Sequence, residues 1–200
     1  MTPADENTQA PGIPVANPID LLAWCEVNKS DFKPPVSNKY LYDGEDFFAM
    51  VIGGPNARND FHLTNSEELF YQLKGDIVVF IREGDRTRPV PVREGETFFI
   101  PAGVPHAPTR PPGTLGLVIE RRRPAGEIEH QQFYCDQCDA LVHDQAFDCA
   151  DIVEHFSQAM ESFWADPEKS TCPECGHVCS KPAPVAHIEF EPEVRIIREG

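Results

Sequence analysis

Short apolar runs separated by turn-forming residues fill the middle of the chain. Five such runs lie between Phe47 and Arg123: FFAMVIGG, ELFYQL, DIVVFIR, ETFFIPAG and LGLVIERR. The segments between them are rich in Gly, Pro, Asn and Asp. Runs of this length and spacing are typical of strands in an all-β sandwich or barrel. We therefore predict a mainly β domain over residues 19–130.

The N-terminal flank has a different pattern. Residues 1–18 are polar and proline-rich, which predicts a flexible arm because proline opposes regular structure and too few apolar residues are present to form a core. The segment IDLLAWCEV that follows, residues 19–27, predicts a short helix beginning near Asn17 or Asp20.

The pattern changes again after residue 130. Apolar residues recur there at three- and four-residue spacing, which predicts one buried face of a helix: Ile152, Val153, Phe156, Met160, Phe163 and Trp164. We place a domain boundary near residues 128–132 and a small module over 131–180. Residues 181–200 alternate enough to form a C-terminal extension, either a strand or a loosely packed arm.

The net charge of the chain indicates which macromolecules it would repel. The 17 Lys and Arg residues against 33 Asp and Glu residues give a formal net charge of −16, which opposes binding to nucleic acid and to anionic membranes. The sequence lacks an apolar run near the ~20 residues needed to span a bilayer. Its N-terminus lacks the basic start and apolar stretch of a signal peptide. We expect a cytoplasmic protein, in which cysteines stay reduced.

Four cysteines form two pairs with metal-binding spacing. Cys135-x-x-Cys138 and Cys172-Pro-x-Cys175-Gly are knuckles that bring four thiolates within reach of one tetrahedral metal. Such a site has no open coordination position, so we predict a structural role. The spacing does not separate iron from zinc, because both accept four thiolates.

The other three cysteines lack a paired spacing. Cys179 lies four residues after Cys175 and is an alternative ligand, which we rank below Cys175. For Cys25 and Cys149 the sequence gives no role.

A second constellation lies in the predicted β domain. The spacings H-x5-E-x6-G, beginning at His62, and G-x5-P-x-G-x2-H, ending at His106, resemble the paired signature motifs of the cupin superfamily. Two imidazoles and one carboxylate, Glu68, form a triad that suits non-haem Fe(II) and leaves positions open for exogenous ligands. Glu67 competes with Glu68; the spacing selects Glu68, while strand alternation only places the two on opposite faces.

Two departures from the cupin pattern are informative. Asp60 occupies a position where many cupins have a histidine, so it is a candidate fourth ligand, but we rank a supporting or structural role above that. Arg110 stands four residues after His106, where many cupins have asparagine.

A narrower resemblance lies in three stretches: NARNDFHLTNSEELFYQLKGD, REGETFFIPAGVPHAPTRPPGTLGLVIERRRP and PPVSNK. They resemble the 3-hydroxyanthranilate 3,4-dioxygenase family, over most of residues 19–180. The cysteine pairs resemble the bacterial-type form, which carries a rubredoxin-like iron site. The resemblance implies a cupin-type double-stranded β-helix (a jelly-roll barrel), Fe(II) at the catalytic site, a second iron at the four cysteines, and a homodimer.

The resemblance also implies a reaction. Fe(II) and O2 open the ring of 3-hydroxyanthranilate, and both oxygen atoms enter 2-amino-3-carboxymuconate semialdehyde. That product cyclises to quinolinate, in the kynurenine route from tryptophan to NAD. The substrate's hydroxyl and amine chelate the metal beside Glu68. Its carboxylate is expected to bind Arg58 and Arg110, because the guanidinium group of arginine can donate two hydrogen bonds to one carboxylate.

Two more residues match family positions. Glu120 ends the apolar run LGLVIE, where an unpaired carboxylate is costly, and we expect Arg110 or the substrate to be its partner. Asn38, in PPVSNK, is expected near the pocket.

Two alternatives stay open at this point. One is a different cupin enzyme with the same triad, such as another ring-cleaving dioxygenase or a thiol dioxygenase, without the set of Arg58, Arg110 and Glu120. The other is a non-catalytic cupin sensor in which the cysteine module binds a partner or responds to redox state.

Overall fold

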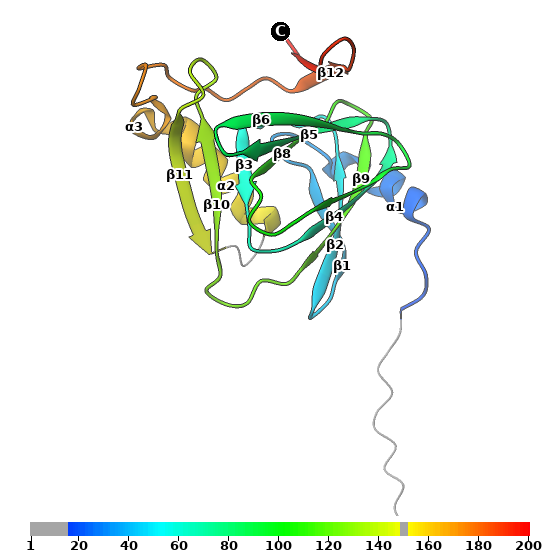
Figure 1. The fold of residues 1–200 in the computed structure, drawn as a ribbon. Helices are drawn as coiled ribbons and strands as arrows, with labels where there is room; N and C mark the ends of the chain where they lie inside the picture. The colour runs from blue at the N-terminus through cyan, green and yellow to red at the C-terminus, as the bar shows by residue number, and fades with distance from the viewer. Residues whose placement is uncertain (1–15, 149–151) are drawn as a thin grey trace, which may run out of the picture.

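The computed structural model describes residues 16–148 and 152–200. Most of the predicted N-terminal arm, and Cys149, lie outside the described residues. Within them the chain is mainly β, as the apolar runs predicted, with short helices at both flanks (Figure 1).

The elements follow one another in a simple order. The helices are α1 (Leu21–Asn28), the 3-10 turn η1 (Lys29–Asp31), α2 (Ile152–Ala165) and α3 (Pro167–Ser170). The strands are β1 (Asn38–Asp43), β2 (Phe47–Gly53), β3 (Asp60–Leu63), β4 (Glu68–Lys74), β5 (Ile77–Glu83), β6 (Arg86–Val92), β7 (Thr97–Ile100), β8 (His106–Thr109), β9 (Leu115–Arg121), β10 (Ile128–Tyr134), β11 (Leu141–Asp148), β12 (Val185–Glu189) and β13 (Arg195–Arg198).

Two antiparallel sheets form a β-sandwich, the jelly-roll architecture predicted from the sequence. One sheet has the order β1-β2-β9-β4-β7 and the other β11-β10-β3-β8-β5-β6. Alternating burial along β4 shows why: Glu68, Phe70 and Gln72 are buried, whereas Leu69 and Tyr71 are exposed. A strand with one apolar face buries that face against a second sheet.

The core between the sheets is aliphatic and aromatic. The side chains of this core are almost completely buried: Phe70, Ile77, Val79, Ile81, Val92, Ile100 and Val118. Burying each such side chain stabilises the fold by about 1.5–3 kcal/mol. This packing gives the ligand-bearing strands a rigid base.

The helix predicted near Ile19 begins slightly later and uses the second of the two candidate caps. Asp20 is the N-cap of α1, and its Oδ1 accepts a hydrogen bond from the backbone N–H of Ala23 at 3.0 Å. Such a cap satisfies one of the free N–H groups of a helix start.

The cysteine-bearing segment shares a sheet with the barrel. The predicted boundary at residues 128–132 falls inside β10, which pairs with β3 on one side and β11 on the other. Helix α2 lies beside these strands (Figure 1). The rings of Phe133 on β10 and Phe163 on α2 stack at 3.8 Å, and Gln131 Nε2 donates to the carbonyl of Phe156 at 3.2 Å. The two parts therefore share one core, and their division into separate domains stays a prediction.

The C-terminal extension forms a two-stranded antiparallel hairpin of β12 and β13, so of the two forms expected for it the strand is present. Among the described residues, no helix is both long and apolar enough to cross a membrane.

Candidate active site

Three predicted metal ligands converge between the two sheets. His62 on β3 and His106 on β8 are direct cross-strand partners, and Glu68 begins β4 of the opposite sheet. The Nδ1 of His62 lies 3.2 Å from Glu68 Oε1, and the Nε2 of His106 lies 3.3 Å from Glu68 Oε2. All three side chains are buried, and one donor atom of each lies within 4.8 Å of the others. Glu67 is exposed, so Glu68 is the glutamate that faces the histidines.

Hydrogen bonds decide which imidazole nitrogens are free. His106 Nδ1 lies 3.0 Å from the carbonyl oxygen of Val104, which can only accept, so Nδ1 donates and Nε2 keeps its lone pair. His62 Nε2 lies 2.9 Å from Glu129 Oε2, a carboxylate that accepts its hydrogen bond, so Nδ1 is the nitrogen that a metal can use. Both free nitrogens point toward Glu68. Two nitrogens and a carboxylate oxygen on one side fit a facial Fe(II) site.

The charges in the site reinforce one another. Burial opposes ionisation of His62, but the carboxylates of Glu129 and Glu68, which accept from its ring, outweigh burial and raise its pKa to about 9. Burial likewise opposes the charge of Glu68, and the two histidines outweigh it and lower its pKa below the usual range. The carboxylates of Glu68 and Glu129 thus place negative charge around His62, which favours a cation at this position.

Arg110 is a buried cation aimed into the same pocket. Its side chain is 0% exposed, and its Nη1 donates to Gln72 Oε1 at 3.1 Å. Its Nε and Nη2 have no hydrogen-bond partner within residues 16–148 and 152–200. Burial, and then the nearby charge of Arg58, lower its pKa to about 9. An unpaired buried charge is costly, so this guanidinium is ready to bind an anion.

Arg58 is held in place by a carboxylate. Its Nε and Nη2 donate to the two carboxylate oxygens of Asp60 at 2.8 and 2.6 Å. The guanidinium also lies 4.9 Å from the centre of the Phe156 ring. Asp60 is thus engaged with Arg58, in agreement with the supporting role predicted for it.

Glu120 has a different partner from the one expected. Its Oε2 accepts from Arg123 Nη2 at 2.6 Å, and no hydrogen bond joins it to Arg110 in the described part of the chain. The reason is the strand direction: Glu120 lies opposite Glu68 across β4 and β9, with Arg123 just beyond the strand end. Burial and the charge of Glu68 raise its pKa to about 7.

Apolar side chains complete the pocket. The polar lining residues are His62, Glu68, His106, Arg58, Arg110, Glu120, Ser37, Asn38 and Asn56, and the apolar ones are Val36, Met50, Ile52, Phe70, Pro108, Val118, Ile152 and Phe156. Asn38 therefore lies at the pocket, as expected. A pocket that is apolar with a few convergent polar groups suits a small aromatic ligand. Two of its walls, Ile152 and Phe156, come from α2.

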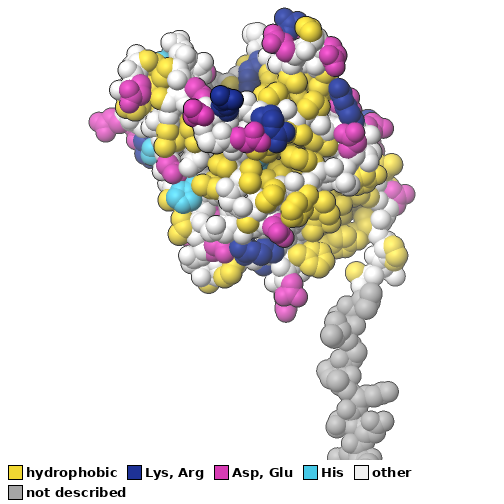
Figure 2. All heavy atoms as spheres, viewed as in Figure 1, with side chains coloured by type: hydrophobic (Ala, Val, Ile, Leu, Met, Phe, Trp, Pro, Cys, Tyr) yellow, Lys and Arg dark blue, Asp and Glu magenta, His cyan; other side chains and the backbone are white. Residues whose placement is uncertain are grey.

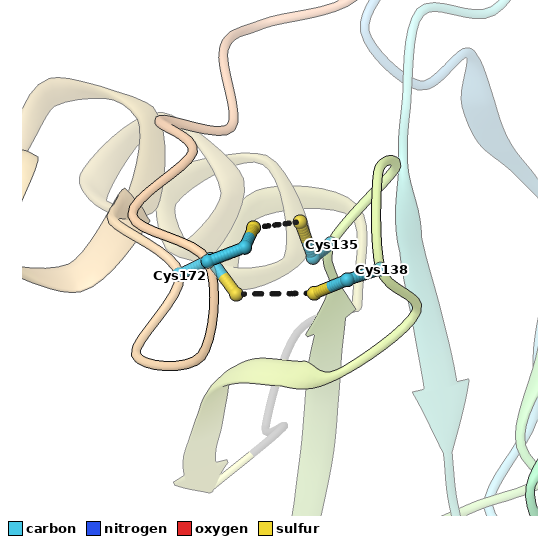
Figure 3. A group of neighbouring side chains, drawn as sticks. Cys135, Cys138 and Cys172 are labelled. Atoms are coloured by element: carbon cyan, nitrogen blue, oxygen red, sulfur yellow. Dashed lines mark hydrogen bonds between the residues drawn. The ribbon is translucent and has the colours of Figure 1, made fainter.

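Four cysteines form the second candidate metal centre. Sγ of Cys135 lies 3.6 Å from that of Cys175, and Sγ of Cys138 lies 3.5 Å from that of Cys172. Figure 3 shows Cys135 and Cys138, at the end of β10, facing the loop that carries Cys172. Metal–sulfur bonds of ~2.3 Å require tetrahedral sulfurs at ~3.8 Å, so this arrangement fits a closed four-thiolate site.

Cys179 lies next to this centre. The Sγ atoms of the four knuckle cysteines all lie within 4.8 Å of one another, whereas the Sγ of Cys179 lies within that distance of Cys135 and Asp136. This geometry favours Cys175 over Cys179 as the fourth ligand.

Comparison with known proteins identifies the family. A family model described as 3-hydroxyanthranilic acid dioxygenase matches residues 14–164. The chain belongs to this family. A 3-hydroxyanthranilate 3,4-dioxygenase of Bacillus thuringiensis is 43% identical over 160 residues, covering 80% of this chain and 89% of the relative. One of Xanthomonas campestris is 40% identical over 172 residues, covering 86% and 97%. The resemblance inferred from the motif blocks is thereby confirmed.

A solved structure gives a more distant match. A cupin-2 domain protein from Shewanella frigidimarina aligns with a TM-score of 0.41 at 20% identity, covering 48% of this chain and 91% of that one.

Several residues that complete the site were not found from the sequence. Glu129 and Arg123 lie behind His62 and Glu120, and Gln72 holds Arg110. Arg123 belongs to a run of three arginines that reads as a solvated strand end, and Glu129 falls in the predicted boundary. For Gln72 the sequence did contain one signal: it lies four residues after Glu68, so strand alternation places both side chains on the same buried face of β4.

Proposed function

We propose that the protein is a 3-hydroxyanthranilate 3,4-dioxygenase that uses Fe(II) bound by His62, Glu68 and His106. The observation that carries the proposal is the position of Arg110. A buried guanidinium with unpaired donors shares one apolar pocket with a two-histidine, one-glutamate triad. The pocket thus offers a metal for chelating groups and a cation for a carboxylate on a single aromatic ring.

His62, Glu68 and His106 would hold the metal, which would serve as a template and an electron conduit between the substrate's hydroxyl and amine and O2. The protein's own residues do the rest. Arg110 pairs with the substrate carboxylate, and Arg58, oriented by Asp60, lies close enough to assist. The apolar walls around Phe70 and Val118 exclude water from the ring, which strengthens each charge interaction inside.

Glu120 is suited to proton movement. Its pKa of about 7 lets it hold or release a proton near neutral pH, and Arg123 fixes its orientation. We assign it the proton of the substrate hydroxyl. The product, as the family resemblance implies, is 2-amino-3-carboxymuconate semialdehyde, a precursor of quinolinate and NAD.

An absorbance assay tests the proposal. The protein is loaded with Fe(II) without oxygen, mixed with 3-hydroxyanthranilate and exposed to air, and the ring-opened product is followed in the near ultraviolet. We expect turnover by the wild type and none by Glu68→Ala, which should also lose the catalytic iron. A different cupin enzyme or a sensor predicts no product from the wild type.

The four-cysteine site is proposed to hold a second iron with a structural role. Four thiolates with no open position cannot bind substrate, and O2 already supplies the oxidant. A reducing, cytoplasmic setting that keeps the thiolates free for a metal is part of this proposal.

A homodimer is proposed on the outer face of the five-stranded sheet. Phe47, Leu69, Tyr71 and Phe99 are 40–55% exposed there, and Figure 2 shows apolar side chains gathered over this part of the surface. Contiguous apolar patches of this kind mark contact surfaces, and a two-fold dimer pairs one such patch with its copy. Sedimentation velocity should give a dimer for the wild type and a monomer for Phe99→Lys.

A further inference from the structure

A fully buried carboxylate stands behind the metal ligand His62. Glu129 is the second residue of β10, just before the residues that pair with β3, and its side chain is 0% exposed. Its Oε2 lies 2.9 Å from His62 Nε2, and its Oε1 accepts from Thr64 Oγ1 at 2.6 Å. The Nε of Arg123 donates to Oε1 as well. Glu129 does not line the pocket, so it cannot touch the substrate.

The contacts of Glu129 point to a specific role. A buried carboxylate is costly unless its partners compensate, and here three donors converge on it. Thr64 and Arg123 both donate to Glu129, so this carboxylate is the acceptor in each of these contacts. An ionised carboxylate can only accept, which requires the proton of His62 to sit on Nε2. The lone pair of Nδ1 is then directed at Glu68 and the metal position.

We propose that Glu129 is a positioning residue that fixes the tautomer and ring orientation of His62 and strengthens it as a metal ligand. Carboxylates that accept from the far nitrogen of a ligating histidine act in this way in other metal sites. This inference rests on the proposed function, because it takes His62 as a ligand of the catalytic metal.

Arg123 connects Glu129 to Glu120, which lines the pocket. The same guanidinium donates through Nε to Glu129 and through Nη2 to Glu120 at 2.6 Å. Its burial is nearly complete, and both carboxylates raise its pKa despite that burial. One arginine thereby orients the carboxylate behind the metal ligand and the carboxylate that faces the substrate.

Cobalt binding to the full-length protein tests the proposal without relying on activity. The cysteine site is first filled with one equivalent of Zn(II), whose occupancy is verified by the absence of thiolate-to-cobalt absorption. Co(II) is then titrated into the wild type and into Glu129→Gln, and its d–d absorption gives the dissociation constant. We expect the variant to bind Co(II) about 10- to 100-fold more weakly, with the cobalt-free protein retaining its circular dichroism spectrum.

The control variant also replaces a carboxylate by an amide, but in a histidine–carboxylate pair that lies outside the catalytic metal site. Asp144 Oδ1 lies 2.7 Å from His130 Nδ1 on neighbouring strands, and Asp144→Asn should leave cobalt affinity unchanged. Equal affinity in Glu129→Gln and Asp144→Asn would overturn the proposal. Failure of the wild type to bind a second metal would instead overturn the triad itself.

A second variant keeps the test decisive if Glu129→Gln does not fold. Thr64→Val removes one hydrogen bond from Glu129 while leaving its charge and the shape of the site in place. A several-fold weaker cobalt affinity in Thr64→Val supports the positioning role. Unchanged affinity in this variant, with Glu129→Gln unfolded, would mean that Glu129 serves the fold alone.

Discussion

At the scale of single residues, the site depends on placing ionised groups in an apolar interior. Each buried charge has a partner arranged by the strands: Asp60 for Arg58, Arg123 for Glu120, and His62 with His106 for Glu68. Arg110 is the exception, with two donor atoms unpaired among the described residues. This contrast is the reason to assign the substrate carboxylate to Arg110.

Gly116 is predicted to be required for the position of Arg110. A Cβ on Gly116 would lie 2.8 Å from Arg110 Nη1 and 3.0 Å from Gln72 Oε1, and both atoms are buried with little room to move. Gly116→Ala should raise KM for 3-hydroxyanthranilate about 10-fold, the size expected for one weakened charged hydrogen bond, with iron content unchanged. Steady-state kinetics and metal analysis measure both. An unchanged KM would show that the guanidinium of Arg110 can shift without weakening substrate binding, and would contradict this prediction.

Glu120 should make the stability of the metal-free protein depend on pH. Its folded-state pKa of about 7 lies above the ordinary 4.5, so the folded state holds this proton more tightly than the unfolded state. The resulting stability is present below about pH 4.5 and is lost as pH rises through about 7. From pH 5 to 8, urea unfolding should show the wild type losing up to about 3 kcal/mol relative to Glu120→Gln. A constant difference between the two proteins would contradict the raised pKa.

At the scale of elements, the sequence predicted the strands with apolar runs, including β4 with Glu68, better than the two short strands that carry the histidines. β2, β4, β5, β7 and β9 correspond to the five apolar runs. β3 and β8 have only four residues each, DFHL and HAPT, and carry too few apolar residues to form a periodic signal. Their histidines were found from motif spacing instead. β6, β10 and β11 were missed because their sequences, RTRPVPV, IEHQQFY and LVHDQAFD, are largely polar or proline-rich and resemble loops.

Partners across the fold were the least predictable feature. Glu129 and Arg123 are joined by β10 pairing with β3 and by the end of β9, and nothing local in the sequence specifies that contact. The same reason explains why Glu120 was assigned to Arg110: both lie near the pocket, but only the strand register decides which arginine reaches the carboxylate.

The cysteine centre should stabilise the active site through α2. It anchors the segment that follows α3, and α2 contributes Ile152 and Phe156 to the pocket. Cys172→Ser should release the second metal, lower the melting temperature by about 10 °C, and raise KM only a few-fold. Cys25→Ser, at another buried cysteine far from the knuckles in sequence, is the control. An unchanged melting temperature in Cys172→Ser would rule out a structural role.

At the scale of the whole molecule, one sandwich serves both metal centres. The triad draws on both sheets, and the cysteine segment adds strands to one of them and a helix to the pocket wall. The apolar runs predicted the sandwich, but they did not show that the two parts share a core, because β10 bridges them where composition changes. Against the net charge of −16, the buried guanidinium of Arg110 is a local positive charge that can bind a small anion.

The central claim is that the triad and Arg110 together recognise one substrate, the metal taking the hydroxyl and amine and the arginine taking the carboxylate. The most direct measurement compares kcat/KM for 3-hydroxyanthranilate and for 2-aminophenol, which lacks the carboxylate, in the iron-loaded wild type and in Arg110→Ala. Arg88→Ala, at an exposed arginine paired with Glu83, is the control.

We predict that the wild type and Arg88→Ala prefer 3-hydroxyanthranilate about 100-fold or more, as expected for a buried charge pair. Arg110→Ala should bind iron normally, require much more substrate, and lose most of that preference. The same preference in Arg110→Ala as in the wild type would contradict the account.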